Sequence, residues 1–460
     1  MTTASPPLGR SLRDRVDLAR NRSRTTPGHL QMLMTAFLFA AIALAVIGAG
    51  TLFVAQHSVS GMRHGTVPAI VGAQHIHATL ADADRAEANA FLAGATEATG
   101  PHHQYTKDIN DAMRQLEVAA EQAGGDTAVG QQIQAISVLI TQYTTLVDIA
   151  RADNEQGYPV GAAYLRQASE LMHKPSEGIL AKVDQLGDLD AQDLSAENTA
   201  LIVTVGLLVL YAAAAIAVLA LLVHSQGFLK DRFHRRRSGP LFLGNVLLLG
   251  VVSSMVVSGF VTGYQLNMAE GQDYGRLLNL WHIRSLVYDA NGSESLSLIA
   301  RGNGDAFDRS FQSNTSRLVD QPVTDVLVDQ AAAGDVRFHG LMADELNASS
   351  GLEREAAMDV LRAYRRFMGV DATVRARSQQ GDHDSAYRLA LGSQPGQLSS
   401  AFTNLDGALG RCIVSIQNQF DFNVAVVEYT LLGAMGLQLF ALAIIWAAYR
   451  GLKPRMDEYL

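Results

Sequence analysis

The stretch LQMLMTAFLFAAIALAVIGAGTLFVAQ, residues 30–56, contains no Asp, Glu, Lys or Arg. Because about 20 helical residues cross a bilayer core of ~30 Å, this stretch is long enough to span a membrane. Three further uncharged apolar stretches follow at residues 200–223, 240–264 and 430–449. A soluble core helix is rarely apolar over such a length, so the sequence predicts four transmembrane helices.

Basic residues are unevenly divided among the segments that flank these stretches. Residues 1–29, 224–239 and 450–460 together carry a net charge of +9, whereas the long segments 57–199 and 265–429 carry −18. Lys and Arg favour the cytoplasmic side of a membrane. We therefore expect a multi-pass plasma-membrane protein with both termini and the middle loop in the cytoplasm and the two long segments outside.

The Arg-rich N-terminal arm could also belong to a cleaved signal peptide. The apolar stretch after it is too long for that, and no A-x-A site ends it, so we expect an uncleaved anchor. Cys412 is the single cysteine, which excludes an intrachain disulfide. An outer domain without disulfides suggests a bacterial protein whose fold depends on packing.

An internal repeat organises the whole chain. HIHATLADADRAEANAFLAG, residues 75–94, is echoed by HIRSLVYDANGSESLSLIAR, residues 282–301, at a constant offset of 207. A second echo pairs QGYPVGAAYLRQAS from Gln156 with QGDHDSAYRLALGS from Gln380. The two halves are therefore interpreted as copies of one unit of span, outer domain and span. The matched pairs include His75 with His282, Asp82 with Asp289, and Glu87 with Glu294.

Each outer domain is predicted to be helical. Apolar residues from Ile133 to Ala150 recur at alternating steps of three and four, which is typical of a buried seam in an antiparallel helical bundle. Glycine and proline breaks predict four helices per domain, the first and last continuous with the spans. The fold class is thus an all-α membrane protein with four transmembrane helices and two extracytoplasmic four-helix-bundle, sensor-like domains. The breaks fall at 94–101, 124–125 and 157–159 in the first domain, and at 302–304 and near Gly334, Gly351 and Gly381 in the second.

No catalytic motif is present. The sequence lacks a phosphate-binding glycine loop, a nucleophile elbow and clustered Cys/His spacing, so neither an enzyme nor a cofactor is expected. His75 and His77, or His102 and His103, are too close in sequence to converge on one metal ion from a helix. Their expected place is a solvated helix face.

Several outer residues are candidates for docking a partner. The repeated acids Asp82, Glu87, Asp289 and Glu294 could form an acidic rim, or they could simply lie on a solvated helix face. Tyr164 and Tyr387 hold matching places after the outer turns, where core or near-core packing is the main alternative. The exposed outer turns add the last two candidates, Asp305 and Asp382.

The cytoplasmic segments are too short to bury a core of their own. Their basic residues could serve topology alone, pair with anionic lipid headgroups, or dock a cytoplasmic partner. The candidates for such docking are Lys230, Arg232, Arg235, Arg236 and Arg237.

The chain resembles the actinobacterial GlnX-type transmembrane sensors. The resemblance is carried by RTTPGHL (24–30), LADADRAEANAFLAG (80–94) and NEQGYPVGAAYLRQASELM (154–172), and the four-span plan covers the whole chain. It implies a relay in which an extracytoplasmic solute-binding lipoprotein senses glutamate, aspartate or glutamine. The membrane protein would pass that state to a cytoplasmic Ser/Thr kinase, protein kinase G. No ligand residue follows from these motifs.

Three functions stay open from the sequence. The first is this transmembrane signal relay, which agrees with the small cytoplasmic mass. The second is a direct sensor that binds a small molecule within its outer helical bundles, and the third is a structural membrane scaffold. Expected partners are the lipoprotein, the kinase, membrane lipids and, as an open alternative, a second copy of the chain. No nucleic acid is expected.

Overall fold

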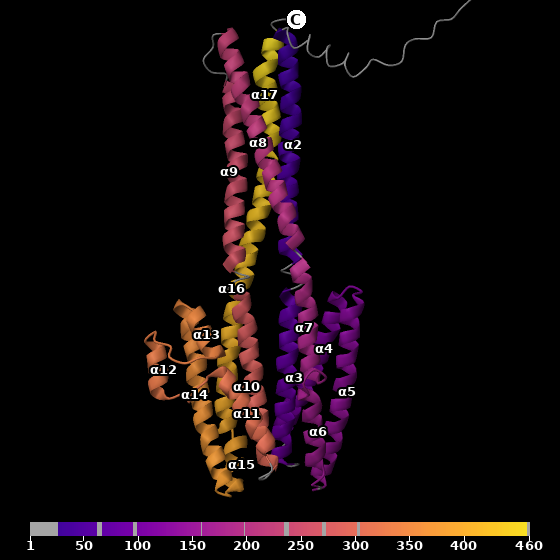
Figure 1. The fold of residues 1–460 in the computed structure, drawn as a ribbon, viewed down its shortest axis with the longest axis vertical. Helices are drawn as coiled ribbons and strands as arrows, with labels where there is room; N and C mark the ends of the chain where they lie inside the picture. The colour runs from indigo at the N-terminus through magenta and orange to yellow at the C-terminus, as the bar shows by residue number, and fades with distance from the viewer. Residues whose placement is uncertain are drawn as a thin grey trace, which may run out of the picture. The chain divides into compact units, whose positions relative to one another are not determined.

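The computed structural model shows a chain built from helices (Figure 1). It describes residues 26–61, 67–94, 99–157, 159–196, 198–233, 239–268, 273–300 and 304–457. No strand occurs within those ranges. Among the described residues, five helical stretches are long and apolar enough to cross a membrane, by length and composition. The prediction of an all-α membrane protein is confirmed.

Four of the five apolar stretches overlap the predicted spans. They are Gln31–His57, Gly206–Phe228, Gly239–Gln265 and Leu398–Gly451, with mean hydropathies of 2.0 to 2.7. The fifth, Thr127–Glu155, has a mean hydropathy of only 1.3. Its buried residues recur at steps of three and four and face other bundle helices, so we treat it as a bundle helix.

The chain divides into two compact units, which we describe separately. The apolar unit contains the predicted spans. Within it, the Tyr211 hydroxyl donates a hydrogen bond to the Val251 carbonyl at 3.2 Å, and the buried Gln438 side chain lies against Gly48, where a Cβ atom would collide with it. Its helices are α2 (Thr26–Gly61), α8 (Asn198–Phe233), α9 (Gly239–Met268), α17 (Phe440–Asp457) and the end of α16 (Leu398–Gln438).

The bundle unit contains both repeats. The first repeat consists of α3 (Val67–Ala93), α4 (Thr99–Gln122), α5 (Thr127–Glu155), α6 (Gly161–His173) and α7 (Ile179–Ala196). The second consists of α10 (Gly275–Ala300), α11 (Asp305–Leu318), α12 (Asp325–Ala332), α13 (Leu341–Ala348), α14 (Gly351–Gln379), α15 (His383–Leu391) and the first part of α16.

The helix count differs from four per repeat. In the first repeat the expected fourth helix is interrupted after His173 by Pro175 and by Ser176, which has a φ of 66°. The buried stripe from Leu165 to Leu186 nevertheless continues across the break. In the second repeat α12 and α13 are added between α11 and α14, and a non-helical segment at residues 392–397 separates α15 from α16.

Continuity between bundle and span is described at only one junction. Residues 62–66 and 269–272, where the first helix of each repeat was expected to continue from its span, lie outside the described residues. In contrast, α16 is a single helix from Leu398 to Gln438, and the boundary between the units falls inside it after Val424.

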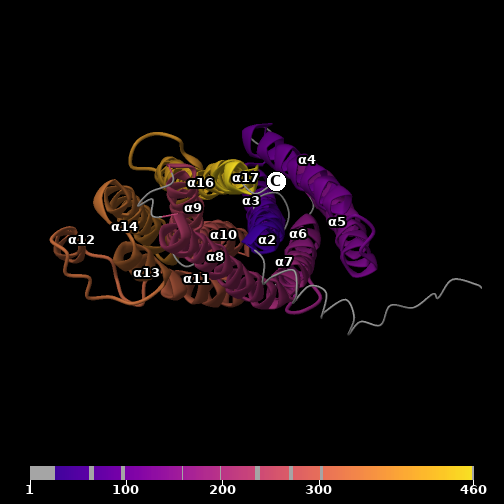
Figure 2. The same ribbon diagram turned by 90° about the horizontal axis from the view of Figure 1, so that it is seen from above.

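The two repeats pack through α3 and α10, which lie side by side in both views of the bundle unit (Figures 1 and 2). The rings of His75 and Trp281 lie 4.8 Å apart, Gly292 packs on Arg85, and Ser295 Oγ donates to Asn89 Oδ1 at 2.6 Å. Contacts therefore advance in the same direction on both helices, so the pair is parallel. Gly292 is the repeat equivalent of Arg85, at an offset of 207, so equivalent positions meet at this seam.

One hydrophobic core serves both repeats. Buried Ile76, Leu80 and Tyr143 of the first repeat belong to the same cluster as Leu280 and Phe402 of the second. Because protein interiors are close-packed and transmit strain, a rearrangement in one repeat is felt in the other.

The close approach at Gly292 can be tested by mutation. A Cβ atom at this position would lie 3.4 Å from Arg85 Cα, an ordinary contact, so Gly292→Ala should be tolerated and gain helix propensity. Gly292→Leu would wedge the helices apart, and overpacking of this kind costs about 1–3 kcal/mol. We expect the leucine variant alone to melt at a lower temperature in thermal unfolding of the full-length protein. Equal melting of the two variants would contradict the tight seam.

Candidate functional site

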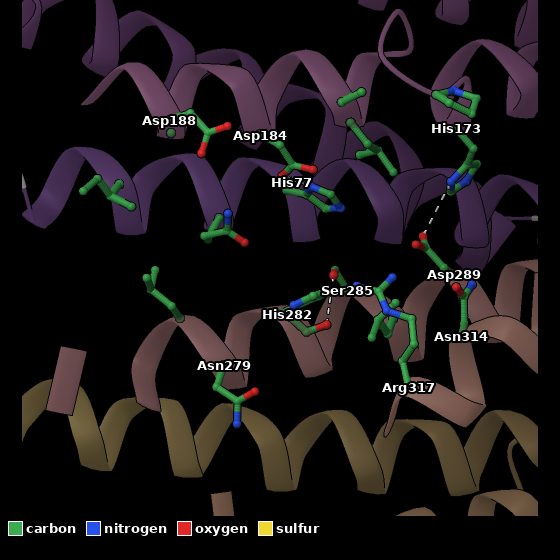
Figure 3. A pocket seen from close by; sticks show the side chains of 18 of the residues that line it. His77, His173, Asp184, Asp188, Asn279, His282, Ser285, Asp289, Asn314 and Arg317 are labelled. Atoms are coloured by element: carbon green, nitrogen blue, oxygen red, sulfur yellow. Dashed lines mark hydrogen bonds and ion pairs between the residues drawn. The ribbon is translucent and has the colours of Figure 1, made fainter. Parts of the chain in front are cut away.

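A cleft lies between the two repeats, with a volume of about 740 Å³ (Figure 3). Its walls come from α3, α7 and the turn before it in the first repeat, and from α10 and α11 in the second. Pockets of about 300–1,000 Å³ at domain interfaces are typical of small-molecule sites. The cleft is therefore the candidate site.

His173, the last residue of α6, connects the repeats at one end of the cleft. Its Nε2 donates to Asp84 Oδ2 at 3.2 Å in its own repeat, and its Nδ1 lies 3.9 Å from Asp289 Oδ1 of the other repeat (Figure 3). Asp84 is buried and also accepts hydrogen bonds from Tyr143 Oη at 3.0 Å and Ser169 Oγ at 2.8 Å. This network holds the imidazole between two carboxylates.

The electrostatics at this end favour a charged imidazole. Burial lowers the pKa of His173, but the charge of Asp289 and the hydrogen bond and charge of Asp84 outweigh it and raise the pKa to about 9. Burial raises the pKa of Asp289, whose charged form His173 stabilises. At neutral pH His173 is thus an imidazolium that bridges the repeats.

Both walls of the cleft carry charged side chains (Figure 3). Asp184 and Asp188 lie on α7, and Arg317 lies on α11. His77 Nδ1 lies 2.7 Å from Asp184 Oδ1, whereas Arg317 Nη2 donates to His282 Nε2 at 2.6 Å. An imidazole that accepts from a guanidinium is neutral, and burial and the charge of Arg317 lower the pKa of His282 accordingly.

A second network of charged side chains occurs in both repeats. In the second repeat Arg375 forms ion pairs with Glu294, Asp308 and Asp371. In the first repeat His102 lies between Glu87 and Arg151, at 3.0 Å and 2.9 Å. Arg151 and Arg375 lie five residues before Gln156 and Gln380, respectively. Both the glutamate and the arginine of the network are therefore duplicated.

The repeated acids are not an exposed rim. Glu87 and Glu294 are each only 2% exposed, and Asp82 is half-buried beside Arg85, with 2.6 Å between Oδ1 and Nε. The expectation of a rim, or of a solvated face, is therefore wrong for both glutamates, which the shared core covers. Asp289 also lies inside, in the wall of the cleft.

The other outer candidates fall into two groups. Tyr164 and Tyr387 are partly buried against the core clusters, and Tyr387 Oη donates to the Leu298 carbonyl at 3.2 Å, in agreement with the near-core interpretation. Asp305 is exposed in the first turn of α11. Asp382 is the N-cap of α15 and accepts from the Ser385 amide.

The cytoplasmic candidates are described only in part. Lys230 and Arg232 belong to the last turns of α8, although their side chains are not described. Arg235, Arg236 and Arg237 lie outside the described residues. No group of three or more metal-ligating side chains occurs among the residues that the structure describes.

Four important residues escaped the sequence analysis. Asp84 aligns with Asn291 at the 207-residue offset, so the repeat gave it no weight. His173 and Arg317 follow no repeated motif, and only the folded chain brings them to the cleft. Arg375 carried a usable signal, because the echo between Gln156 and Gln380 extends five residues upstream to the two arginines.

Comparison with known families finds a match over the first repeat. Residues 58–199 match the model of an actinobacterial sensor domain. These residues include α3 to α7 and thus one side of the cleft. No curated protein and no solved structure matches the chain. The first repeat is therefore similar to actinobacterial sensor domains, and the chain also contains helices apolar enough for a membrane.

The bridge at His173 predicts a pH-dependent stability. The folded-state pKa, about 9, lies above the ordinary value of 6.5, so the contribution is complete below pH 6.5 and is lost as pH rises through 9. We expect His173→Gln to lower the melting temperature most near pH 6 and least near pH 10. Melting curves of both proteins across this range test the bridge. A difference that grows with pH would contradict it.

Proposed function

We propose that the protein is a transmembrane signal relay. Its outer repeats would read an extracytoplasmic amino-acid-binding lipoprotein of the glutamate, aspartate or glutamine class. They would pass its state to a cytoplasmic Ser/Thr kinase of the protein kinase G type. The sensor-domain match over residues 58–199 and the apolar helices support the general role, and the sequence resemblance supports the partners.

The observation that carries the proposal is the shared core of the two repeats at the α3–α10 seam. Partner binding to one repeat cannot reshape it without moving the other. In sequence, α3 and α10 follow the apolar helices α2 and α9, and α16 extends from the bundle unit into the apolar unit. A coupling of only ~1–3 kcal/mol between two helix arrangements is enough for allosteric signalling.

The two ends of the relay use different residues. Asp305 and Asp382, on the outer turns, remain candidates for docking the lipoprotein. Lys230, Arg232 and the arginines at 235–237 are the candidates for presenting the signal to the kinase. A partner that bound both helix arrangements equally would transmit nothing.

A capture experiment tests the relay. The full-length protein in lipid nanodiscs is mixed with the lipoprotein, with and without glutamate, aspartate or glutamine. The relay predicts that capture changes with the amino acid and weakens when Asp305 and Asp382 are both replaced by alanine. The exposed Asp344 on α13 provides a matched control as Asp344→Ala. Identical capture in all conditions would exclude the relay.

The cleft favours a second candidate function, a direct small-molecule sensor. It lies between the repeats, where a ligand would act on the seam without any docked protein. A ligand that binds only the folded protein raises its melting temperature. Thermal shifts with amino acids, in the absence of the lipoprotein, therefore distinguish the two candidates.

A further inference from the structure

We infer that the cleft between the repeats binds a small zwitterion, a free amino acid, whose ammonium group faces α7 and whose carboxylate faces α11. The inference rests on the sensor role proposed above but on neither partner protein. Its basis is the cavity, the positions of Asp188 and Arg317 on its two walls, and groups there that lack partners among the described residues.

Three acids and three cations line the cleft, and two of the cations already have carboxylate partners. Its acids are Asp184, Asp188 and Asp289, and its cations at neutral pH are Lys174, Arg317 and the His173 imidazolium. His173 lies between two carboxylates and Lys174 pairs with Glu177, which leaves the acids of α7 and Arg317 of α11. A molecule that carries both signs matches Asp188 on one wall and Arg317 on the other.

Two charged groups in the walls are free to take a ligand. Among the described residues, Arg317 contacts a neutral imidazole and no carboxylate, and Asp188 makes no ion pair. Arg317 can offer two parallel N–H donors to a carboxylate, the geometry in which guanidinium binds most strongly. Asp188, one turn from Asp184 on the same face of α7, can accept from an ammonium group.

Asp289 adds a buried acceptor at the end of the cleft. Its Oδ1 is inaccessible to solvent and accepts no hydrogen bond from the described residues, and His173 Nδ1 lies 3.9 Å away. Buried carboxylate oxygens are nearly always hydrogen-bonded in native proteins. A ligand donor, or a small inward movement of His173, would satisfy it.

Such a ligand would connect the repeats. Asp188 belongs to the first repeat and Arg317 to the second, so a zwitterion held by both would act as a strut across the seam. The ligand would stabilise the arrangement in which Asp188 and Arg317 can both reach it. The size of this effect is set by the difference between its affinities for that arrangement and for the other.

Calorimetric titration of the full-length protein in nanodiscs tests this inference. The probes are the twenty standard amino acids and γ-aminobutyrate, in which the charges lie farther apart. For each binder, the matching amine without a carboxylate and the matching acid without an ammonium group are titrated as well. We expect saturable binding of at least one amino acid and at least about tenfold weaker binding of both analogues.

Two variants locate the binding. Arg317→Gln should weaken binding of the amino acid about tenfold or more and leave the weak amine unaffected, because only the carboxylate partner is lost. Asp188→Asn should also weaken binding of the amino acid but leave the weak acid analogue unaffected, because only the ammonium partner is lost. Arg362→Gln, on the exposed face of α14, and Asp344→Asn are the matched controls, and melting curves show that each variant is folded.

Failure of the inference is distinguishable from failure of the relay. Absence of binding by all probes, equal binding of an acid analogue, or unchanged affinity in both variants would overturn the zwitterion site. The capture experiment with the lipoprotein is scored separately, because it measures protein contact outside the cleft. Amino-acid-dependent capture without calorimetric binding would leave the relay in place and exclude the ligand in the cleft.

Discussion

Replacement of Arg375 by leucine is expected to destabilise the protein by about 3–5 kcal/mol, the usual result of leaving buried charges without their partner. Arg375 holds Glu294 and Asp371, each only 2% exposed, together with Asp308, whose Oδ1 lies 3.0 Å from Arg375 Nη1. Leucine keeps some of the apolar contact with Phe311, over whose ring the guanidinium lies. The loss is therefore electrostatic more than steric.

The same variant should recover as the pH falls. Burial and the charge of Asp371 raise the pKa of Glu294 to about 8, and burial raises the pKa of Asp371 to about 6 against the opposing charge of Arg375. Both values exceed the ordinary ones, so the folded state binds more protons and gains stability as pH falls through 8 towards 4.5. Without Arg375 this gain becomes larger, because no cation then offsets the repulsion between the buried carboxylates. Protonation of the acids removes that repulsion.

Melting temperatures of the full-length protein at pH about 8.5 and about 5.5 measure both effects. Arg377→Leu is the matched control, because Arg377 lies on the same helix, is half exposed and makes only a 3.7 Å ion pair with Asp382. Surface substitutions of this kind usually change stability by less than about 0.5 kcal/mol. If the two variants melted alike, or if Arg375→Leu recovered at high pH instead, the network would not have the role assigned to it.

Asp84→Ala is expected to have the second largest effect, also about 3–5 kcal/mol. The substitution leaves the Tyr143 and Ser169 hydroxyls without their acceptor inside the core and removes one of the two carboxylates at the His173 imidazolium. Tyr143 is fully buried, so water cannot replace the lost acceptor. Each orphaned buried group costs about 1–3 kcal/mol.

The conservative variant and a neighbour separate the causes. Asp84→Asn keeps a carbonyl acceptor and should lose less stability than Asp84→Ala. Asp82→Ala, two residues earlier on α3, removes an i,i+3 ion pair with Arg85 but also relieves the repulsion between Asp82 and Asp108, so it is expected to cost less than Asp84→Ala. Thermal unfolding should show the largest loss of stability for Asp84→Ala and smaller losses for Asp84→Asn and Asp82→Ala. A loss at Asp82 equal to that at Asp84 would contradict the bridging network.

Much of the candidate site could not be predicted from the sequence. The 207-residue repeat directed attention to Glu87 and Glu294, and both do lie in buried networks, but exposure was the wrong expectation. Helix periodicity does not reveal burial when a second domain covers the face that would otherwise be solvated. The neutral or small residues between the acids on α3 and α10, such as Ala86 and Gly292, are what allow that cover.

The sequence by itself determined the helical class, the apolar stretches and the duplication, because uncharged length and residue spacing are local properties of the chain. It also determined the seam on α5, from Ile133 to Ala150, since a 3,4 step places those side chains on one face. Only the tertiary structure decided that α3 pairs with its own copy α10, that His173 lies between Asp84 and Asp289, and that Asp188 and Arg317 face one cleft. Those relations join residues more than 80 positions apart, and close packing of the two repeats, rather than any local preference, brings them together.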